Sequence, residues 1–104
     1  KALLCKMKIP GINQEYKVYV SNSRMYRSEV GNILSSKEEC DFAVIYTYNL
    51  YNNEWWVSMR ADKNRGNIDV SKIGEHFPGG GGHACASGFT WSGHIRELLE
   101  PIKE

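Results

Sequence analysis

The segment from Phe77 to Phe89 reads Phe-Pro-Gly-Gly-Gly-Gly-His-Ala-Cys-Ala-Ser-Gly-Phe. Four consecutive glycines have no side chains to pack and lose much backbone entropy when they become ordered. Such a run is either a flexible connector or a place where the backbone closely approaches another group. Because a histidine and small residues follow at once, without a Ser- or Lys-rich spacer, we favour close approach. Successive backbone N–H groups beside an imidazole suit an oxyanion, so the segment indicates recognition of a phosphate or a nucleotide.

Two better-known phosphate motifs do not describe this glycine run. No Lys-Ser or Lys-Thr pair follows it, as a Walker A loop requires. The strand before and helix after that a dinucleotide fingerprint needs are also missing from the pattern. The glycines therefore predict a loop of another kind.

Length, charge and cysteine content set the broad class. With 104 residues we expect one domain over residues 1–104, and a start at Lys1 rather than methionine suggests a fragment of a longer protein. Thirteen basic and twelve acidic residues give a net charge of +1, so any nucleotide site is local and no bulk attraction to nucleic acid or membrane is expected. Three scattered cysteines, with no signal peptide and no apolar run near ~20 residues, predict reduced thiols and a cytoplasmic location. The three histidines show no zinc-ligand spacing, and no metal site or catalytic residue is expected in the chain.

Hydrophobic periodicity predicts a small α+β domain with a mixed sheet of about five strands and about three helices. The strands are expected over 2–9, 16–20, 41–48, 54–60 and 84–91, with 41–48 central because it is apolar on both faces and 54–60 its antiparallel partner. Three helices are expected: one capped by Ser28 that buries Val30, Ile33 and Leu34, one capped by Asp69 that buries Val70, Ile73 and Phe77, and one after Ser92 that buries Ile95, Leu98, Leu99 and Ile102.

Arg60 ends the strand 54–60, on the same face as Ser58 and Trp56. A guanidinium at a strand end suits bidentate contact with a phosphate, and the alternative is a surface arginine paired with Asp62 or solvent. Further cations near in sequence add charge to the same rim or are ordinary loop charges, and one exposed aromatic ring near the glycines is suited to stacking a base. These cations are Lys63, Arg65 and Lys72, and two other histidines, His76 and His94, are expected to be plain surface residues.

At this point the pattern resembles a known family. The Gly-Gly-Gly-Gly-His-x-x-Ala-Ser-Gly-Phe stretch at 79–89 is similar to the signature of the DHHA1 domain, the C-terminal domain of DHH-family phosphoesterases. That group includes single-strand-specific exonucleases, nano-RNA and cyclic-dinucleotide phosphodiesterases and exopolyphosphatase-related proteins. The agreement extends to Val57-Ser58-Met59-Arg60, to the helix start at 68–73, to Asp41-Phe42-Ala43 and to Ser28-Glu29-Val30. Pro78 departs from the pattern, since many members run directly from Phe into the glycines.

The resemblance implies a substrate-binding domain, with hydrolysis by two divalent cations, manganese or magnesium, held in a separate N-terminal DHH domain. The Asp-His-His triplet of that domain is absent from this chain. The implied ligand is a short oligonucleotide, a dinucleotide or a related phosphate ester. The positions to which the resemblance carries phosphate binding are Arg60, Gly80, Gly81, Gly82, His83, Ala86 and Ser87.

The expected function is therefore to position a phosphate for hydrolysis elsewhere in a parent hydrolase, with no hydrolysis by this chain alone. Three alternatives remain open. The chain is a stand-alone nucleic-acid-binding module, a tRNA-contacting DHHA1 domain of an alanyl-tRNA-synthetase-like protein, or a structural domain whose glycines serve packing. A tRNA-contacting domain would favour a strongly basic face, which the near-neutral charge does not supply.

Overall fold

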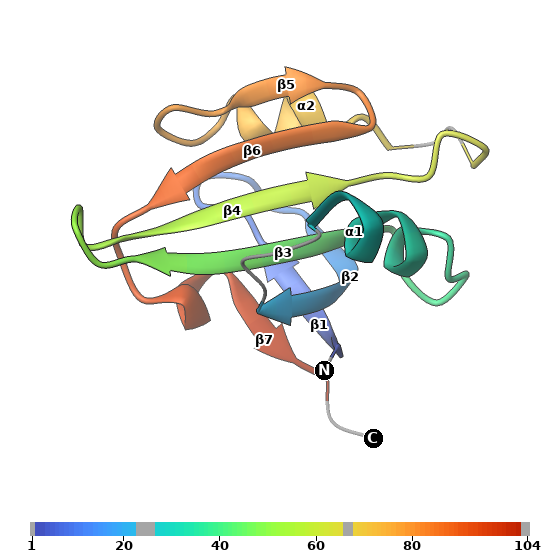
Figure 1. The fold of residues 1–104 in the computed structure, drawn as a ribbon, viewed down its shortest axis with the longest axis horizontal. Coiled ribbons are helices and arrows are strands. Elements are labelled where there is room, and N and C mark those ends of the chain that lie inside the picture. The colour runs from blue at the N-terminus through green and yellow to red at the C-terminus, as the bar shows by residue number, and fades with distance from the viewer. Residues whose placement is uncertain (1, 23–26, 66–67, 103–104) are drawn as a thin grey trace.

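A computed structural model describes residues 2–22, 27–65 and 68–102, except the side chains of Arg27 and Ser28. Within these ranges the chain forms one seven-stranded sheet, two α-helices and a short 3-10 helix (Figure 1). The strand order is β5-β6-β4-β3-β2-β1-β7, and β2 and β3 run parallel while the other neighbours are antiparallel. The elements are β1 Leu3–Lys8, β2 Glu15–Asn22, α1 Arg27–Ser35, β3 Phe42–Asn49, β4 Glu54–Arg60, α2 Val70–Gly74, β5 Gly81–His83, β6 Ala86–Trp91, η1 Ile95–Glu97 and β7 Leu99–Pro101.

The expected α+β class and mixed sheet are confirmed, but about five strands and three helices is only roughly right. β3 is the central strand, and Phe42, Val44 and Ile45 on it are fully buried. β4 pairs with it in antiparallel register, as expected from the Asn49–Asn53 turn, where Asn53 has a φ of 52°. The two additional strands, β5 and β7, form the edges of the sheet.

The main core lies between the sheet and α2. Val18, Val44, Met59 and other buried apolar side chains of the strands fill it, together with side chains that follow the chain around α2. Among these, the Phe77 and Phe89 rings stack with centroids 3.8 Å apart. Val70, Ile73 and Phe77 are buried as predicted, although Phe77 lies three residues beyond the end of α2.

The predicted C-terminal helix is wrong. Residues 95–97 form one 3-10 turn, and β7 then pairs antiparallel with β1, with Met7 opposite Leu99 and Cys5 opposite Pro101. A proline in a helix interior lacks an N–H donor and clashes with the carbonyl four residues earlier, so Pro101 disfavours a helix that continues to Ile102. At the sheet edge its missing N–H is tolerated.

Helix α1 covers the other face of the sheet, over β3 and β4 (Figure 1). Its buried residues are Gly31, Leu34 and Ser35, whereas Ile33, which we expected to be inside, is 64% exposed. The expected capping role of Ser28 concerns a side chain outside the described part of the chain.

Candidate functional site

Helix α2 sets where the glycine run begins. The Asp69 side chain caps it as predicted, accepting a hydrogen bond from the Ser71 amide at 3.0 Å. The Ser71 hydroxyl donates to the same carboxylate. Both hydrogen bonds lower the pKa of Asp69, the one from the hydroxyl more strongly, because they favour the ionised carboxylate. The helix ends at Gly74, and the chain then reaches Phe77, which the core buries. The glycines therefore start from a fixed point in the core.

The first half of the glycine run is a packed turn. Gly79 has a φ of 65°, which glycine adopts without strain. The amide of Gly80 donates to the Phe77 carbonyl at 3.1 Å, and a Cβ on Gly80 would overlap the Gly74 carbonyl oxygen. Gly80 therefore lets the turn lie directly on the end of α2, and its amide is used within the protein.

The second half of the run is the edge strand β5, which the sequence did not predict. Gly81 and Gly82 have φ values of 152° and 145°, a region that residues with side chains rarely adopt. A Cβ on Gly82 would lie 2.6 Å from the Ala86 oxygen, whereas a Cβ on Gly81 would meet nothing within 4 Å. Gly82 is thus required by backbone packing, and Gly81 faces open space.

The register of the sheet places Arg60 and His83 on the same face. Arg60 lies opposite Ala86 across β4 and β6, and His83 lies opposite Ala86 across β6 and β5. Directly opposed residues of antiparallel strands point to the same side. Ala86 therefore lies between a guanidinium and an imidazole, whose Cα atoms are two strand spacings, about 10 Å, apart.

A second row of small residues runs beside the first. Ser58 lies opposite Gly88, and Gly88 lies opposite Gly81. With Ala86 these three residues make a surface without long side chains, which we call the small-residue floor (Ser58, Gly81, Ala86 and Gly88). The next row contains the larger side chains Trp56 and Thr90. The floor is therefore shallow, with Arg60 and His83 at one end and Trp56 at the other.

Helix α1 holds the stem of Arg60 in place. A Cβ on Gly31 would lie only 2.5 Å from Cγ and 3.0 Å from Cβ of Arg60, so the helix and the stem are in close contact. The Nη1 atom of Arg60 also donates to the Met59 carbonyl at 3.3 Å. The side chain is half-buried, and these two contacts restrict its rotation.

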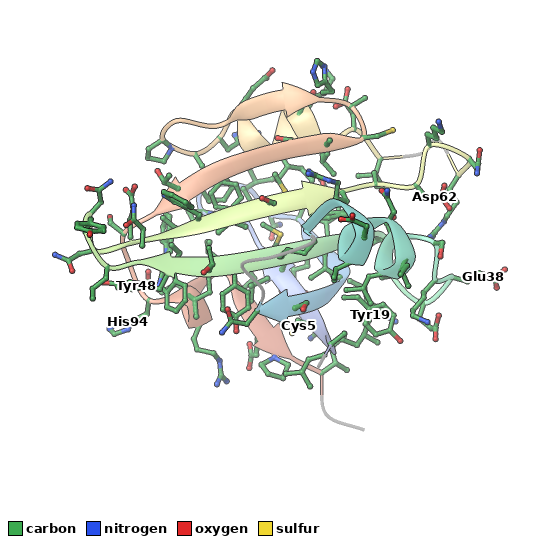
Figure 2. The ribbon with its side chains drawn as sticks, in the orientation of Figure 1. Cys5, Tyr19, Glu38, Tyr48, Asp62 and His94 are labelled. Carbon is green, nitrogen blue, oxygen red and sulfur yellow. The ribbon has the colours of Figure 1, made fainter. Side chains whose placement is uncertain are left out.

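A cavity of about 420 Å³ opens next to Arg60, between α1, the loop after β4 and the β5–β6 turn. Asp62, labelled in Figure 2, lies in this loop, where its Oδ1 atom accepts a hydrogen bond from the Asn64 amide at 3.0 Å. Lys63 brings a second cation to the lining. The lining residues are Asn32, Ser35, Arg60, Ala61, Asp62, Lys63, Asn64, Cys85 and Ala86.

Short backbone hydrogen bonds join the β5–β6 turn to its surroundings. The carbonyl of Ala84 accepts from the Val70 amide at 2.9 Å, and that of Cys85 accepts from the Ala61 amide at 2.9 Å. The turn is therefore tied to the start of α2 and to the end of β4. These bonds fix the position of His83, the residue before the turn, relative to Arg60.

Ser87 does not share the surface of Arg60 and His83. It lies opposite Met59 and Gly82, is 5% exposed, and its hydroxyl donates to the Gly81 carbonyl at 3.1 Å. The structure thus places the side chain of Ser87 beneath the glycine strand, on the α2 side. There it contacts the strand and not the surface above it.

The remaining candidate cations and histidines lie apart from the floor, with Lys63 the exception. Arg65 donates through Nη1 to the carbonyls of Ser35 and Lys37 at 3.3 and 3.0 Å, so it satisfies the end of α1. Lys72 and His76 line another cavity, of about 290 Å³, on the α2 side. His94 lies near η1, away from β5 (Figure 2). His76 and His94 are exposed, as the sequence predicted, and Arg65 and Lys72 add no charge to the floor.

Several residues of this surface were missed from the sequence, among them two on α1. Gly31 permits α1 to contact Arg60, and Asn32 lines the cavity beside it. A glycine inside a helical pattern is a signal of close packing, so Gly31 had a readable signal. Asn32 had none, because a polar residue on a helix is usually solvated.

Two of the three cysteines lie inside the protein, away from this surface. All three are free, and burial raises the pKa of Cys5 and Cys40, which keeps those thiols protonated. Among the described residues, no three His, Cys, Asp or Glu side chains gather in a way that would hold a metal ion. Within the same ranges, no helix has the length and apolar character to cross a membrane.

Comparison with known proteins gives relatives of undefined activity. The chain is 37% identical over 87 residues to an uncharacterized protein of Acanthamoeba polyphaga mimivirus, a match that covers 82% of this chain and 20% of the relative. Its fold is similar to the crystal structure of an uncharacterized protein from Helicobacter pylori, with a TM-score of 0.63 and 27% identity over 86% of this chain and 23% of that one. The chain therefore spans about a fifth to a quarter of the length of these relatives. No protein-family model matches it.

Proposed function

We propose that this chain is a DHHA1-like domain that binds a phosphate of a short oligonucleotide, a dinucleotide or a related phosphate ester. The observation that supports this most is the single cross-strand row of Arg60, Ala86 and His83. It gives two donors suited to an oxyanion on either side of an alanine. The open space at Gly81 leaves room for the ligand at the next row.

Of the seven residues expected to bind phosphate, we assign direct contact to Arg60, His83, Gly81 and Ala86. Gly80 and Gly82 act by allowing close backbone packing, and Ser87 acts by holding the Gly81 carbonyl from below. This division refines the expectation from the resemblance, in which all seven had one role. It also gives Gly80 and Gly82 a packing role, which is the role that the structural-domain alternative assigned to all the glycines.

In this proposal the domain positions a phosphate and a separate DHH domain of a longer cytoplasmic hydrolase cleaves it. Two divalent cations, manganese or magnesium, would supply Lewis-acid chemistry and an activated water in that domain. These ions are assigned to the other domain because the resemblance places them there. What this chain contributes is orientation of the substrate, which lowers the barrier when it is geometrically correct.

Binding of AMP and of 5′-phosphorylated diadenylate, measured by calorimetry, tests the assignment. Arg60→Met keeps the aliphatic stem against Gly31 and removes the charge, so it separates binding from folding. Loss of a charge-assisted hydrogen bond costs about 1.5–3 kcal/mol, which is about 10- to 150-fold in Kd. We expect this loss for Arg60→Met and for His83→Ala, with little change in the melting temperature.

The matched controls are Arg96→Ala and His94→Ala, which remove the same groups elsewhere on the surface. Both should bind as the wild type does. Equal binding by Arg60→Met, His83→Ala and the wild type would contradict the proposal. So would hydrolysis of diadenylate by the pure chain with added Mn²⁺, since we assign cleavage to another domain.

A stand-alone nucleic-acid-binding module is the second candidate, because the same row would serve it equally well. The two readings differ in the parent polypeptide. A DHH-type partner domain predicts manganese-dependent release of mononucleotides by the full-length protein that Arg60→Met slows. A binding module predicts tight binding and no release.

A further inference from the structure

The end of the small-residue floor opposite Arg60 carries an exposed aromatic ring that the phosphate row does not use. Trp56 is 43% exposed, although it lies in the middle of a strand that has partners on both sides. Its neighbour Trp55 points to the opposite face, where its ring packs against Tyr46 and Tyr48 at centroid distances of 5.4 and 4.9 Å. The two tryptophans thus have different environments: Trp55 is partly buried among aromatic rings, and Trp56 is the more exposed.

A cavity of about 300 Å³ lies beside this ring at the end of β3 and β4. None of its lining residues is charged, so a neutral flat group would meet aromatic, hydroxyl and amide groups there. Tyr48 marks this end of the sheet in Figure 2, and Asp62 marks the other end, where the cavity beside Arg60 lies. The lining residues are Thr47, Tyr48, Asn49, Leu50, Tyr51 and Trp56.

The distance between the two ends defines the ligand. Trp56 and Arg60 lie on one face of β4, four residues apart, which is about 13 Å along a strand. Within one nucleotide a single sugar separates the phosphate from the base, so the base of the nucleotide whose phosphate contacts Arg60 stays near that end of the floor. The base of the next nucleotide is placed to meet Trp56 if the backbone crosses the floor at Ser58 and Gly88, where small side chains leave room.

We infer that Trp56 is a stacking platform for the base of a second nucleotide, the one next to the nucleotide whose phosphate contacts Arg60. The inference rests on the proposed phosphate site. Stacking on a tryptophan tolerates any base, because every base has a π face. Trp56 therefore favours ligands of two or more nucleotides without selecting among the bases.

The test compares one ligand that reaches Trp56 with one that does not. In the 104-residue chain, Trp56→Ala should weaken binding of 5′-phosphorylated diadenylate about 5- to 150-fold, the measured range for loss of one stacked base. Binding of AMP should change less than twofold. Trp56→Phe, which keeps a ring, should recover most of the affinity, and Ile33→Ala, which removes an exposed apolar side chain from α1, should have no effect.

Fluorescence supplies a second readout. Diadenylate should quench the tryptophan emission of the wild type more than that of Trp56→Phe, while AMP should quench both weakly. An equal loss of AMP and diadenylate affinity in Trp56→Ala would overturn the inference, as would no loss for either. If Arg60→Met weakens binding of both ligands and Trp56→Ala weakens binding of neither, the result supports the phosphate site and contradicts the stacking role of Trp56. If the wild type binds neither ligand, both proposals are wrong.

Discussion

The two faces of the sheet are built from the same strands but are covered very differently. On the α2 face, side chains such as Met59 and Phe89 are almost completely buried, and aromatic rings stack against each other. On the α1 face a single helix covers β3 and part of β4. The small-residue floor on β4, β6 and β5 carries only short side chains or none. Alternation along β4 and β6 therefore lets one strand supply a core to one side and an open surface to the other.

This difference separates residues that matter for folding from residues that we propose for binding, even where they are neighbours in sequence. Met59 and Ser58 are one residue apart and lie on opposite faces. Gly80 and Gly81 are also adjacent, yet one is packed and the other faces open space. Substitutions in such pairs test the comparison directly.

The largest effect is expected for Gly80→Ala. Its Cβ would overlap the Gly74 carbonyl, and backbone atoms on both sides have to move. We expect a loss of more than about 4 kcal/mol, in the range of exceptional single substitutions, or failure to fold. Gly81→Ala, with open space but an unfavourable φ, should cost only about 1–3 kcal/mol. Urea unfolding of both variants measures the difference, and equal costs would contradict it.

Met59→Ala should be the next largest. The side chain is fully buried on the α2 face, and truncation of a buried methionine costs about 2–5 kcal/mol. The control Ser58→Ala, on the floor, should change the free energy of unfolding by less than about 1 kcal/mol. If Ser58→Ala proved as costly as Met59→Ala, the α1 face would be a second core rather than an open surface.

Helix α1 offers a third, smaller comparison. Leu34 is 7% exposed and Ile33 is 64% exposed, so Leu34→Ala should cost about 2 kcal/mol and Ile33→Ala less than about 0.5 kcal/mol. Thermal melts of the two variants give the order. Equal costs would contradict this orientation of the helix and fit the sequence-based expectation that both side chains are buried.

The smallest effect concerns the cap of α2. Asp69 has a lowered pKa in the folded protein, so its ionised form stabilises the fold above the unfolded value near ~3.9, and this contribution is lost as pH falls through the folded pKa. Asp69→Ala should lower the melting temperature by a few degrees at pH 7. The gap from the wild type should shrink as pH is lowered below about 4. A gap that stays constant with pH would exclude the carboxylate as the source.

The sequence predicted well those elements whose side chains report their own burial. The central strand 41–48 is apolar throughout, and the Asp69 cap and the Asn49–Asn53 turn have local chemical signatures. Arg60 was placed on the correct face by alternation alone, together with Ser58 and Trp56. Its alignment with His83, however, depends on the register of β4 against β6, which lies far from it in sequence.

The errors have identifiable physical causes. Glycine has a low preference for strands, so β5 forms because β6 and α2 hold it, not because of its own residues. The 3.6-residue spacing of Ile95, Leu98 and Leu99 imitates a helix, and Pro101 was the overlooked signal against it. In α1, the contact of Gly31 with Arg60 turns Ile33 outward, which no periodicity could reveal.

The contact between Gly31 and Arg60 has a consequence for affinity. A long side chain that is immobilised on binding loses about 0.5–1.5 kcal/mol of conformational freedom. Here helix α1 restricts the lower part of the arginine side chain, and the Met59 carbonyl accepts a hydrogen bond from its guanidinium. In the proposed site an anion would thus meet a guanidinium that is already partly restrained, and a bulkier residue at position 31 would weaken capture without touching the ligand.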